Sequence, residues 1–327
     1  MHILFEYNTK LPAILYGGIQ RIVWDLAKEL SKLNHKVTLL VKEGSYCDFA
    51  DVIYYDTSKP LNEQIPDDVD VVHMCSQPKE AMHKPYIAMR QVNTMDANIK
   101  LDINTSFVSK NHAARFGSDV YVHNCLDWNN FLKPELNSKR EYLHFLAKAA
   151  WKVKNVKGSI KISRKAKEKL VVMGGTRLNF KMGFRFTPYP SISFTGMVDN
   201  AQKSKIMNQS KGLLFPVVWH EPFGIALIES LYFGCPVMGT PYGSLPELIH
   251  DEVGFLSSSS DELAQAVKDI DAYSKHRCHE YAQEVFNAKV MTQHYLKLYE
   301  KVLNGETLNK KEPQLVNVQP SKHLPFN

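Results

Sequence analysis

The sequence lacks the features that mark secreted, fibrous and membrane-spanning proteins. Its five cysteines include no CxxC pair, which argues against a disulfide framework and against a zinc cluster. No apolar run reaches the ~18–20 residues that a membrane span needs, and 16 glycines and 16 prolines are too few for a fibrous chain. The first residues do not show the basic-then-apolar layout of a signal peptide. We therefore expect a globular protein in the reducing cytoplasm.

Positive charge is concentrated in one segment. The chain carries 40 Lys and Arg residues against 34 Asp and Glu residues, a net charge of +6. Residues 148–181 contain eleven basic residues and one acidic residue, Glu168, so the rest of the chain is net acidic by four. Such a cluster suits an anionic partner: a nucleotide phosphate, a nucleic acid or a membrane surface. A solvated helix face explains the same composition without a ligand.

The hydrophobic pattern predicts two α/β halves in tandem. The first 45 residues read as strand, helix and strand, because apolar residues recur at a spacing of 3–4 over residues 19–33 between two buried-strand runs. A βαβ unit of this kind implies a parallel sheet. A second alternation of strands and helices begins at residue 142, after the polar stretch 124–140, which we interpret as the interdomain linker.

The segment 219–231 combines the features of a phosphate site. A strand gives way to a short loop, and an apolar helix begins near Gly224. The backbone N–H groups of Gly224 and Ile225 would lie at the helix N-terminus, where donors and dipole favour an anion. Glu229 on the helix suits the two hydroxyls of a ribose, and Glu221 on the loop reaches another part of the same ligand. A helix with solvated carboxylates fits the local pattern equally well.

This segment resembles the signature of retaining, family-4-type glycosyltransferases (glycosyl transferases group 1). Glu221 and Glu229 stand in the context Glu-Pro-Phe-Gly-Ile…Ile-Glu-Ser-Leu…Gly-Cys-Pro-Val, and the resemblance extends over roughly residues 1–303. Individually weaker similarities lie at residues 17–21, 70–73, 124–127, 194–198 and 242–247. In the fifth of these segments Ser244 replaces a glycine of the family's turn, and in the third Cys125 replaces a glycine of the family's linker.

The resemblance implies a fold of class α/β, the GT-B fold, in which two Rossmann-like domains have parallel sheets facing across a cleft. We expect an N-terminal acceptor domain over residues 1–130 and a C-terminal nucleotide-sugar domain over residues 131–288. A helix over residues 289–304 is expected to cross back to the N-terminal domain. Residues 305–327 are polar and interrupted by proline, which predicts a flexible tail.

The resemblance also implies roles for individual residues. Glu221 would bind the hydroxyls of the sugar, Glu229 the ribose, and the backbone of Val198 the base. Lys148 and Lys154 match the cations that hold the donor diphosphate, although a lysine at 148 lacks the bidentate fork of the family's arginine. Lys152 and Lys157 are alternatives for the second cation. Further donor contacts are expected from Phe223, Gly224, Ile225 and Gly18.

The acceptor side and metal use are marked less clearly. His73 follows a strand and Ser109 begins a loop after another, so both are candidates to face the acceptor, although a satisfied strand-end histidine is the simpler interpretation of His73. Residues 68–70 match the metal-binding pattern Asp-x-Asp but lead directly into a strand. The histidines and cysteine of residues 276–279 lack a fourth ligand. No metal is therefore expected.

Together these features predict a metal-independent, retaining, hexosyltransferase-type enzyme that needs no cofactor. It would move a sugar from a UDP- or GDP-linked donor to a carbohydrate or lipid-linked sugar acceptor in surface polysaccharide, lipopolysaccharide or glycolipid synthesis. One alternative is a sugar-nucleotide epimerase of the same fold. Another is a nucleic-acid-binding protein that uses residues 148–181, but that segment lacks interleaved aromatics and no nucleic acid is expected as a partner. The lysines beyond Lys154 suggest peripheral contact with anionic lipids at the inner face of the membrane.

Overall fold

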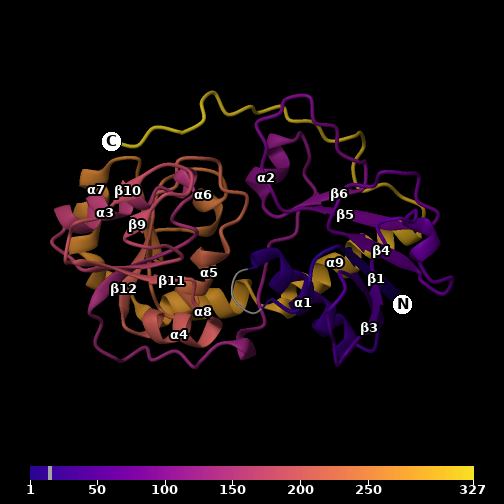
Figure 1. Cartoon of the computed structure of the whole chain (residues 1–327), viewed down its shortest axis with the longest axis horizontal. Coiled ribbons are helices and arrows are strands. Elements are labelled where there is room, and N and C mark those ends of the chain that lie inside the picture. Colours follow the sequence, from indigo (N-terminus) through magenta and orange to yellow (C-terminus); the bar gives the residue numbers. More distant parts are fainter. Residues whose placement is uncertain (14–16) are drawn as a thin grey trace. The chain divides into compact units, whose positions relative to one another are not determined.

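A computed structural model describes residues 1–13 and 17–327. The described chain divides into two compact units, which Figure 1 shows coloured along the sequence. The first unit contains residues 1–127 and 287–318, and the second contains residues 128–286 and 319–327. Each unit is built on a six-stranded sheet whose strand pairs are parallel. The tandem α/β organisation predicted from the sequence is therefore confirmed.

The sheet of the first unit has the strand order β3-β2-β1-β4-β5-β6. Strand β1 pairs with β2 on one side and with β4 on the other. The elements are, in chain order, β1 (His2–Tyr7), α1 (Gly18–Lys32), β2 (Lys36–Val41), β3 (Asp51–Tyr54), η1 (Asn62–Gln64), β4 (Val71–Met74), β5 (Tyr86–Arg90), β6 (Thr105–Phe107), α2 (Lys110–Arg115) and α9 (Ala288–Leu303).

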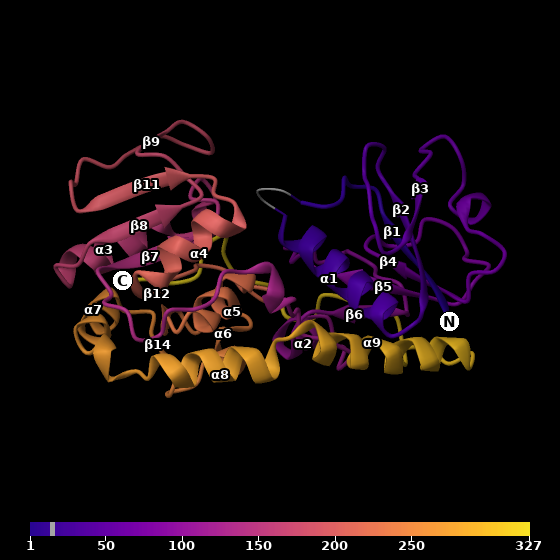
Figure 2. The ribbon, with the colours of Figure 1, turned by 90° about the horizontal axis from the view of Figure 1, so that it is seen from below.

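Two helices of this unit are buried along one stripe each. The predicted apolar stripe of α1 is buried at Ile22, Val23, Leu26 and Leu30. Helix α9 packs against α1, β4 and β5, and Figure 2 shows it running along this unit. Because its tyrosines and other apolar residues recur at helical spacing, one face of α9 closes the core of the first unit although the helix lies far away in the sequence.

The sheet of the second unit has the strand order β11-β8-β7-β12-β13-β14, with a separate two-stranded hairpin, β9–β10. The elements are η2 (Trp128–Asn130), β7 (Tyr142–Leu146), η3 (Lys152–Lys154), α3 (Val156–Lys165), β8 (Leu170–Met173), β9 (Leu178–Asn179), β10 (Arg185–Phe186), β11 (Ile192–Gly196), α4 (Asn200–Asn208), β12 (Ser210–Phe215), α5 (Ile225–Tyr232), β13 (Val237–Gly239), α6 (Leu245–Leu248), β14 (Gly254–Leu256), α7 (Ser260–Lys268), η4 (Ile270–Ala272) and α8 (Lys275–Val285).

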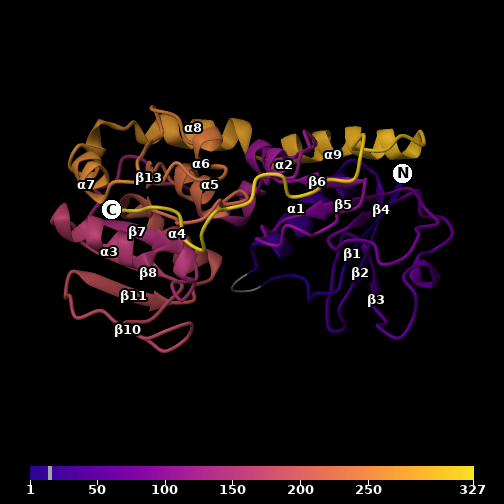
Figure 3. The same ribbon diagram turned by 90° about the horizontal axis from the view of Figure 1, so that it is seen from above.

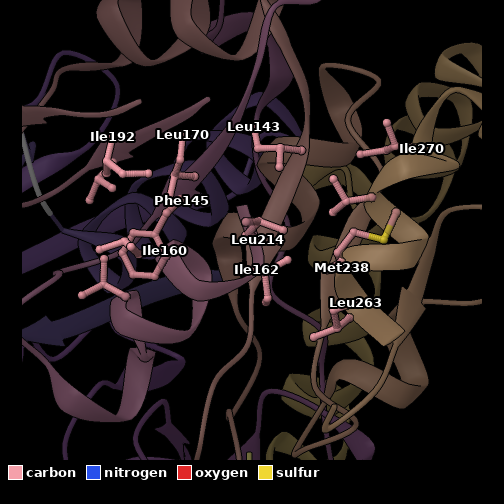
Figure 4. Packing of buried hydrophobic residues seen from close by; sticks show 14 of the residues in the cluster. Leu143, Phe145, Ile160, Ile162, Leu170, Ile192, Leu214, Met238, Leu263 and Ile270 are labelled. Atoms are coloured by element: carbon pink, nitrogen blue, oxygen red, sulfur yellow. The ribbon is translucent and has the colours of Figure 1, made fainter. Parts of the chain in front are cut away.

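The core of the second unit lies between one face of this sheet and helices α3 and α7. Figure 4 shows side chains from the strands, such as Phe145 and Leu214, packed with Ile160 of α3 and Leu263 of α7. The strands read as near-continuous apolar runs because a parallel sheet is covered on both faces. This rigid core fixes the loops that leave the carboxyl ends of the strands, where the candidate site lies.

The prediction of a flexible tail apart from both domains is wrong. Residues 305–318 belong to the first unit, where Leu315 is buried in a cluster with Phe107 and Phe116. Residues 319–327 belong to the second unit, and Figure 3 shows the chain ending beside α3 and α7. Phe326 packs there against the core. These apolar anchors are spaced too irregularly to form a period, so the sequence pattern misses them.

Candidate functional site

In the second sheet, the order in which the chain adds strands reverses between the two central strands, β7 and β12. From β7 the chain proceeds outward through β8 to β11, whereas from β12 it proceeds the other way through β13 to β14. Ligands of open α/β sheets bind outside the carboxyl ends of the strands at such a switch point. The loops that leave β7 and β12 here carry three predicted site residues, Lys148, Lys154 and Glu221.

These two loops are joined to each other by backbone and side-chain bonds. The N–H of Val218 donates to the carbonyl of Val153 (2.9 Å). Asn155 adopts a left-handed conformation, caps helix α3 through Gly158 N–H (2.9 Å), and donates from its amide to the carbonyl of Pro216 (2.9 Å). The resulting pair of loops is preorganised before any ligand arrives.

Glu221 and Lys154 form a partly enclosed ion pair. Lys154 Nζ lies 2.6 Å from Glu221 Oε2, and Trp219 Nε1 donates to the same oxygen at 2.8 Å. The ammonium also lies 5.3 Å from the ring centroids of Phe215 and Trp219, a distance typical of cation–π contact. Both of these donors bind Oε2 of Glu221 rather than sharing its two oxygens.

Helix α5 begins beside this pair. Gly224 is its N-cap in a left-handed conformation (φ 86°), and a Cβ there would lie 3.0 Å from Leu227 and 3.3 Å from Glu221. Phe223 is buried against Phe286, with ring centroids 6.0 Å apart. Glycine therefore allows the chain to turn sharply into Ile225 and presents the first N–H groups of the helix at the end where an anion is favoured.

The turn at residues 242–244 supports the Glu221 loop from behind. A Cβ on Gly243 (φ 68°) would lie 2.2 Å from the nitrogen and 2.3 Å from the oxygen of Glu221. Ser244 donates its N–H to the Glu221 carbonyl (2.9 Å) and its hydroxyl to the Phe223 carbonyl (2.6 Å). The serine that replaces a family glycine thus adds a bond to the loop.

Glu229 lies one to two turns into α5 and is paired with a lysine that the sequence reasoning missed. Lys203 of helix α4 forms an ion pair with Glu229, and both side chains are almost fully buried. Lys203 also lies 5.1 Å from the ring centroid of Phe131. The capping box from Asp199 to Gln202 indicates helix α4, but no local pattern indicates a partner 26 residues away.

Two further donor-side predictions fall on other loops. Lys148 is exposed, and its Nζ lies 5.7 Å from the Trp151 ring. Val198 is buried just after β11, at the N-terminal side of helix α4. Both residues lie in loops that follow the carboxyl ends of strands in the second sheet, whereas Gly18 is the first residue of α1 in the first unit.

The structure buries both acceptor-side candidates, and for His73 this agrees with the simpler interpretation of the sequence, a histidine engaged within the protein. His73 is fully buried inside β4, bonded to Tyr299 (2.7 Å) and stacked on Phe5, and burial lowers its pKa to about 3. Ser109 is fully buried and caps α2 by accepting the N–H of His112 (3.0 Å). Neither side chain can contact an acceptor here, since each is committed to internal packing.

The first unit has a switch point of its own, between β1 and β4. Glu6 lies near the carboxyl end of β1, is buried, and accepts the hydroxyl of Ser76 at 2.8 Å. Burial raises the pKa of this carboxyl. Sequence reasoning passed over Glu6 because a single acidic residue in an apolar strand has no motif around it, yet its position at a strand end is a signal of function.

The aspartates of the Asp-x-Asp match are engaged elsewhere. Asp68 pairs with Lys36 (2.6 Å), and Asp70 accepts the N–H of His2 (2.7 Å). Within residues 1–13 and 17–327, no group of three or more His, Cys, Asp or Glu side chains is placed to hold a metal ion. None of the described helices combines the length and apolar character of a membrane span.

Comparison with known proteins adds independent information. Residues 127–285 match the family model described as "Glycosyl transferases group 1". The chain is 27% identical over 116 residues to an uncharacterized 41.2 kDa protein in the cps region of Klebsiella pneumoniae, covering 33% of this chain and 32% of that protein. It is 27% identical over 124 residues to N-acetyl-alpha-D-glucosaminyl L-malate synthase of Bacillus anthracis, covering 35% and 32%. These matches span about a third of the relatives' length.

Similarity to solved structures extends over almost the whole chain. The crystal structure of AviGT4, a glycosyltransferase involved in avilamycin A biosynthesis, superposes with a TM-score of 0.75 and 18% identity over 94% of this chain and 99% of that one. Anabaena Alr3699/HepE in complex with UDP-glucose superposes with a TM-score of 0.64 and 17% identity over 92% and 99%.

Two Rossmann-like units with parallel six-stranded sheets, together with these superpositions, define a GT-B fold. Within it, residues 127–285 match the model of the glycosyl transferases group 1 family. The resemblance to glycosyl transferases group 1 is therefore confirmed for the part of the chain that carries Glu221 and Glu229.

Proposed function

We propose that the protein is a retaining, metal-independent glycosyltransferase that moves a sugar from a nucleotide-sugar donor to a hydroxyl acceptor. The observation that carries the proposal is the N-terminus of α5 at the sheet's switch point, flanked by two buried carboxylates, Glu221 and Glu229, that are each paired with a lysine. Hydroxyl-rich ligands suit carboxylates, and a diphosphate suits the lysines and the helix N-terminus.

Each residue has a defined task in this proposal. Glu229 binds the ribose hydroxyls, Glu221 binds hydroxyls of the transferred sugar, and the Val198 backbone meets the base. Lys154 and Lys148 stabilise the diphosphate, with the N–H groups of α5. As the bond between the anomeric carbon and the diphosphate oxygen breaks, negative charge develops on that oxygen, where preorganised cations and dipoles are most effective.

The acceptor hydroxyl then forms the new bond on the same face of the sugar. Its proton passes to the departing diphosphate oxygen, so the products are the glycoside, with the donor's anomeric configuration, and the nucleoside diphosphate. The charge is held by lysines and helix N–H groups, which is why we propose a reaction that needs neither a metal nor a cofactor.

The donor is a UDP- or GDP-linked sugar and the acceptor a carbohydrate or lipid-linked sugar. Support for a uridine donor comes from the structurally similar HepE, which is described in complex with UDP-glucose. Support for a role in surface polysaccharide synthesis comes from the relative in a cps region. We propose that the protein acts in the cytoplasm, at the inner face of the membrane.

The experiment is a panel of UDP- and GDP-sugars incubated with the full chain, with and without EDTA, while release of the nucleoside diphosphate is measured. We expect release from one class of donor, unchanged by EDTA. Glu221→Gln should lower kcat/KM by about a hundredfold, since it weakens charge-assisted hydrogen bonds, whereas the control Glu300→Gln, at an exposed position of α9, should not. No release from any donor, or full activity of Glu221→Gln, would refute the proposal.

A further inference from the structure

The connection between β8 and β11 lacks the helix that normally links neighbouring parallel strands. Residues 176–187 form a β-hairpin instead, in which Asn179 pairs with Arg185 and Leu178 with Phe186. Its turn passes through Met182 (φ 57°) and Gly183 (φ 110°). Figures 2 and 3 both show this hairpin beyond β11, at the edge of the sheet.

One face of the hairpin is apolar and exposed. Because side chains alternate along a strand, Leu178 and Phe180 share a face with their cross-strand neighbours Phe184 and Phe186. These four side chains are 47%, 74%, 67% and 55% exposed, in that order. The rings of Phe180 and Phe184 lie 5.8 Å apart. Scattered exposed apolar residues are ordinary, but four on one face of a short hairpin indicate a partner.

The opposite face anchors the hairpin to the second unit. Arg185 is buried and donates to the Thr187 hydroxyl (2.9 Å) and the Thr176 carbonyl (3.0 Å). Arg177 donates to the carbonyls of Thr187, Tyr189 and Ile192, which fixes the base of the hairpin to the start of β11. The apolar face is therefore held outward by bonds on the inner face.

A basic pocket lies directly beside the apolar face. It has a volume of about 480 Å³ and is lined by Phe186 and Arg185 of the hairpin and by basic residues of α3, namely Lys157, Lys161, Arg164 and Lys165. Lys165 is neutralised by Asp261 (2.6 Å), and Arg164 lies over the Tyr189 ring (3.7 Å). Within the described part of the chain, Arg185 is bonded to neutral oxygens rather than to a carboxylate, so a bound anion would complete its charge balance.

We propose that this hairpin and pocket dock the protein on a bilayer that contains acidic phospholipids. The apolar face enters the interfacial region, and the pocket receives a headgroup phosphate. This pairing of aromatic and aliphatic side chains with adjacent lysines and arginines is what an anionic lipid surface selects. A second copy of this chain is a poor partner for the apolar face, because a two-fold contact would place the basic pocket next to the same basic pocket of the other copy, and like charges repel.

The experiment is co-sedimentation of the full chain with vesicles of phosphatidylcholine alone or mixed with phosphatidylglycerol. We expect binding to the mixed vesicles that weakens as salt rises. The double variant Phe180→Ser/Phe184→Ser should reduce partitioning at least tenfold, and Lys157→Ala/Lys161→Ala about tenfold or more. The matched controls, Tyr46→Ser (68% exposed in the first unit) and Lys297→Ala/Lys301→Ala on α9, should bind like the original chain.

A spectroscopic measurement makes the result independent of the stability of these variants. Phe180→Trp should show a blue-shifted emission on adding the mixed vesicles, whereas Tyr46→Trp should not. The proposal is overturned if the mixed vesicles are not bound at low salt, or if the Phe180/Phe184 double variant binds them unchanged. It is also overturned if that double variant still binds the vesicles but no longer binds an oligonucleotide or no longer self-associates. Because vesicle binding is measured without any sugar donor, its failure is distinct from failure of sugar transfer.

Discussion

Gly243 offers a sharp test of the placement of Glu221. Replacing it with alanine would put a Cβ at 2.2 and 2.3 Å from the backbone nitrogen and oxygen of Glu221, where ordinary contacts are 3.4–4 Å. The Glu221 backbone must therefore retreat by about 1 Å, and a displacement of that size costs roughly a hundredfold in rate when the displaced group is in the reaction centre. We expect Gly243→Ala to lower kcat/KM for sugar transfer by about that factor.

A matched control separates the displacement of Glu221 from the loss of stability that alanine causes at a positive φ angle. Gly243 and Gly305 both have positive φ angles, 68° and 77°, but a Cβ on Gly305 has nothing within 4 Å. Each alanine variant therefore loses about 1 kcal/mol from left-handed strain, a shift of a few degrees in Tm. The assay is kcat/KM beside calorimetric Tm for both variants. Equal activity of Gly243→Ala and Gly305→Ala would refute the assigned position of Glu221.

Three further predictions follow from buried groups. Lys203→Met should destabilise the chain by about 3–5 kcal/mol in urea unfolding, because it removes one partner of a buried ion pair, and adding Glu229→Gln should restore part of that loss. Burial raises the pKa of Asp25 to about 7, so the original chain should lose stability relative to Asp25→Asn as pH rises from about 4 through 7, by at most about 4 kcal/mol, measured as unfolding free energy at pH 5 and pH 8. Ending the chain after Val318 should cost on the order of 3 kcal/mol in the same assay, because Phe326 leaves the core and Val218 loses the N–H of Leu324.

The sign of the pH prediction follows from the direction of the shift. A carboxyl whose folded pKa lies above its unfolded value binds its proton more tightly in the folded state, so its contribution is present at low pH and is lost as pH rises through the folded pKa. A difference between Asp25→Asn and the original chain that shrinks with rising pH would contradict the burial assigned to Asp25. For the other two, full stability of Lys203→Met or of the shortened chain would show that these contacts are not made.

Periodicity made the repeated elements of this fold predictable. The spacing of apolar residues in α1 and the apolar runs of β1 and β2 predict a βαβ unit directly. The start of helix α5 at Gly224 is predicted by the loop before it and the apolar run after it. The hairpin at residues 176–187 was not predicted, because two residues per strand are too few to show an alternation.

The site residues also divide into those that a local sequence motif indicates and those that only tertiary packing brings to the site. Glu221 and Glu229 lie in one continuous motif, so sequence reasoning could select them. Lys203 lies in a different helix, and only tertiary packing pairs it with Glu229. The sequence left both roles of His73 open, because a histidine at the end of a strand looks the same in sequence whether its side chain contacts a ligand or, as here, Tyr299. Partners distant in the chain leave no local pattern.

The central claim is that the loops after β7 and β12 bind a nucleoside diphosphate and its sugar. The most direct measurement is calorimetric titration of UDP and GDP, with and without the attached sugar, into the full chain, Glu229→Gln and the exposed control Glu300→Gln. The account predicts one site on the original chain and on the control, and at least tenfold weaker binding by Glu229→Gln, because a charge-assisted bond to the ribose is lost. Binding by Glu229→Gln as tight as by the original chain, or no binding of any of these nucleotides, would contradict it.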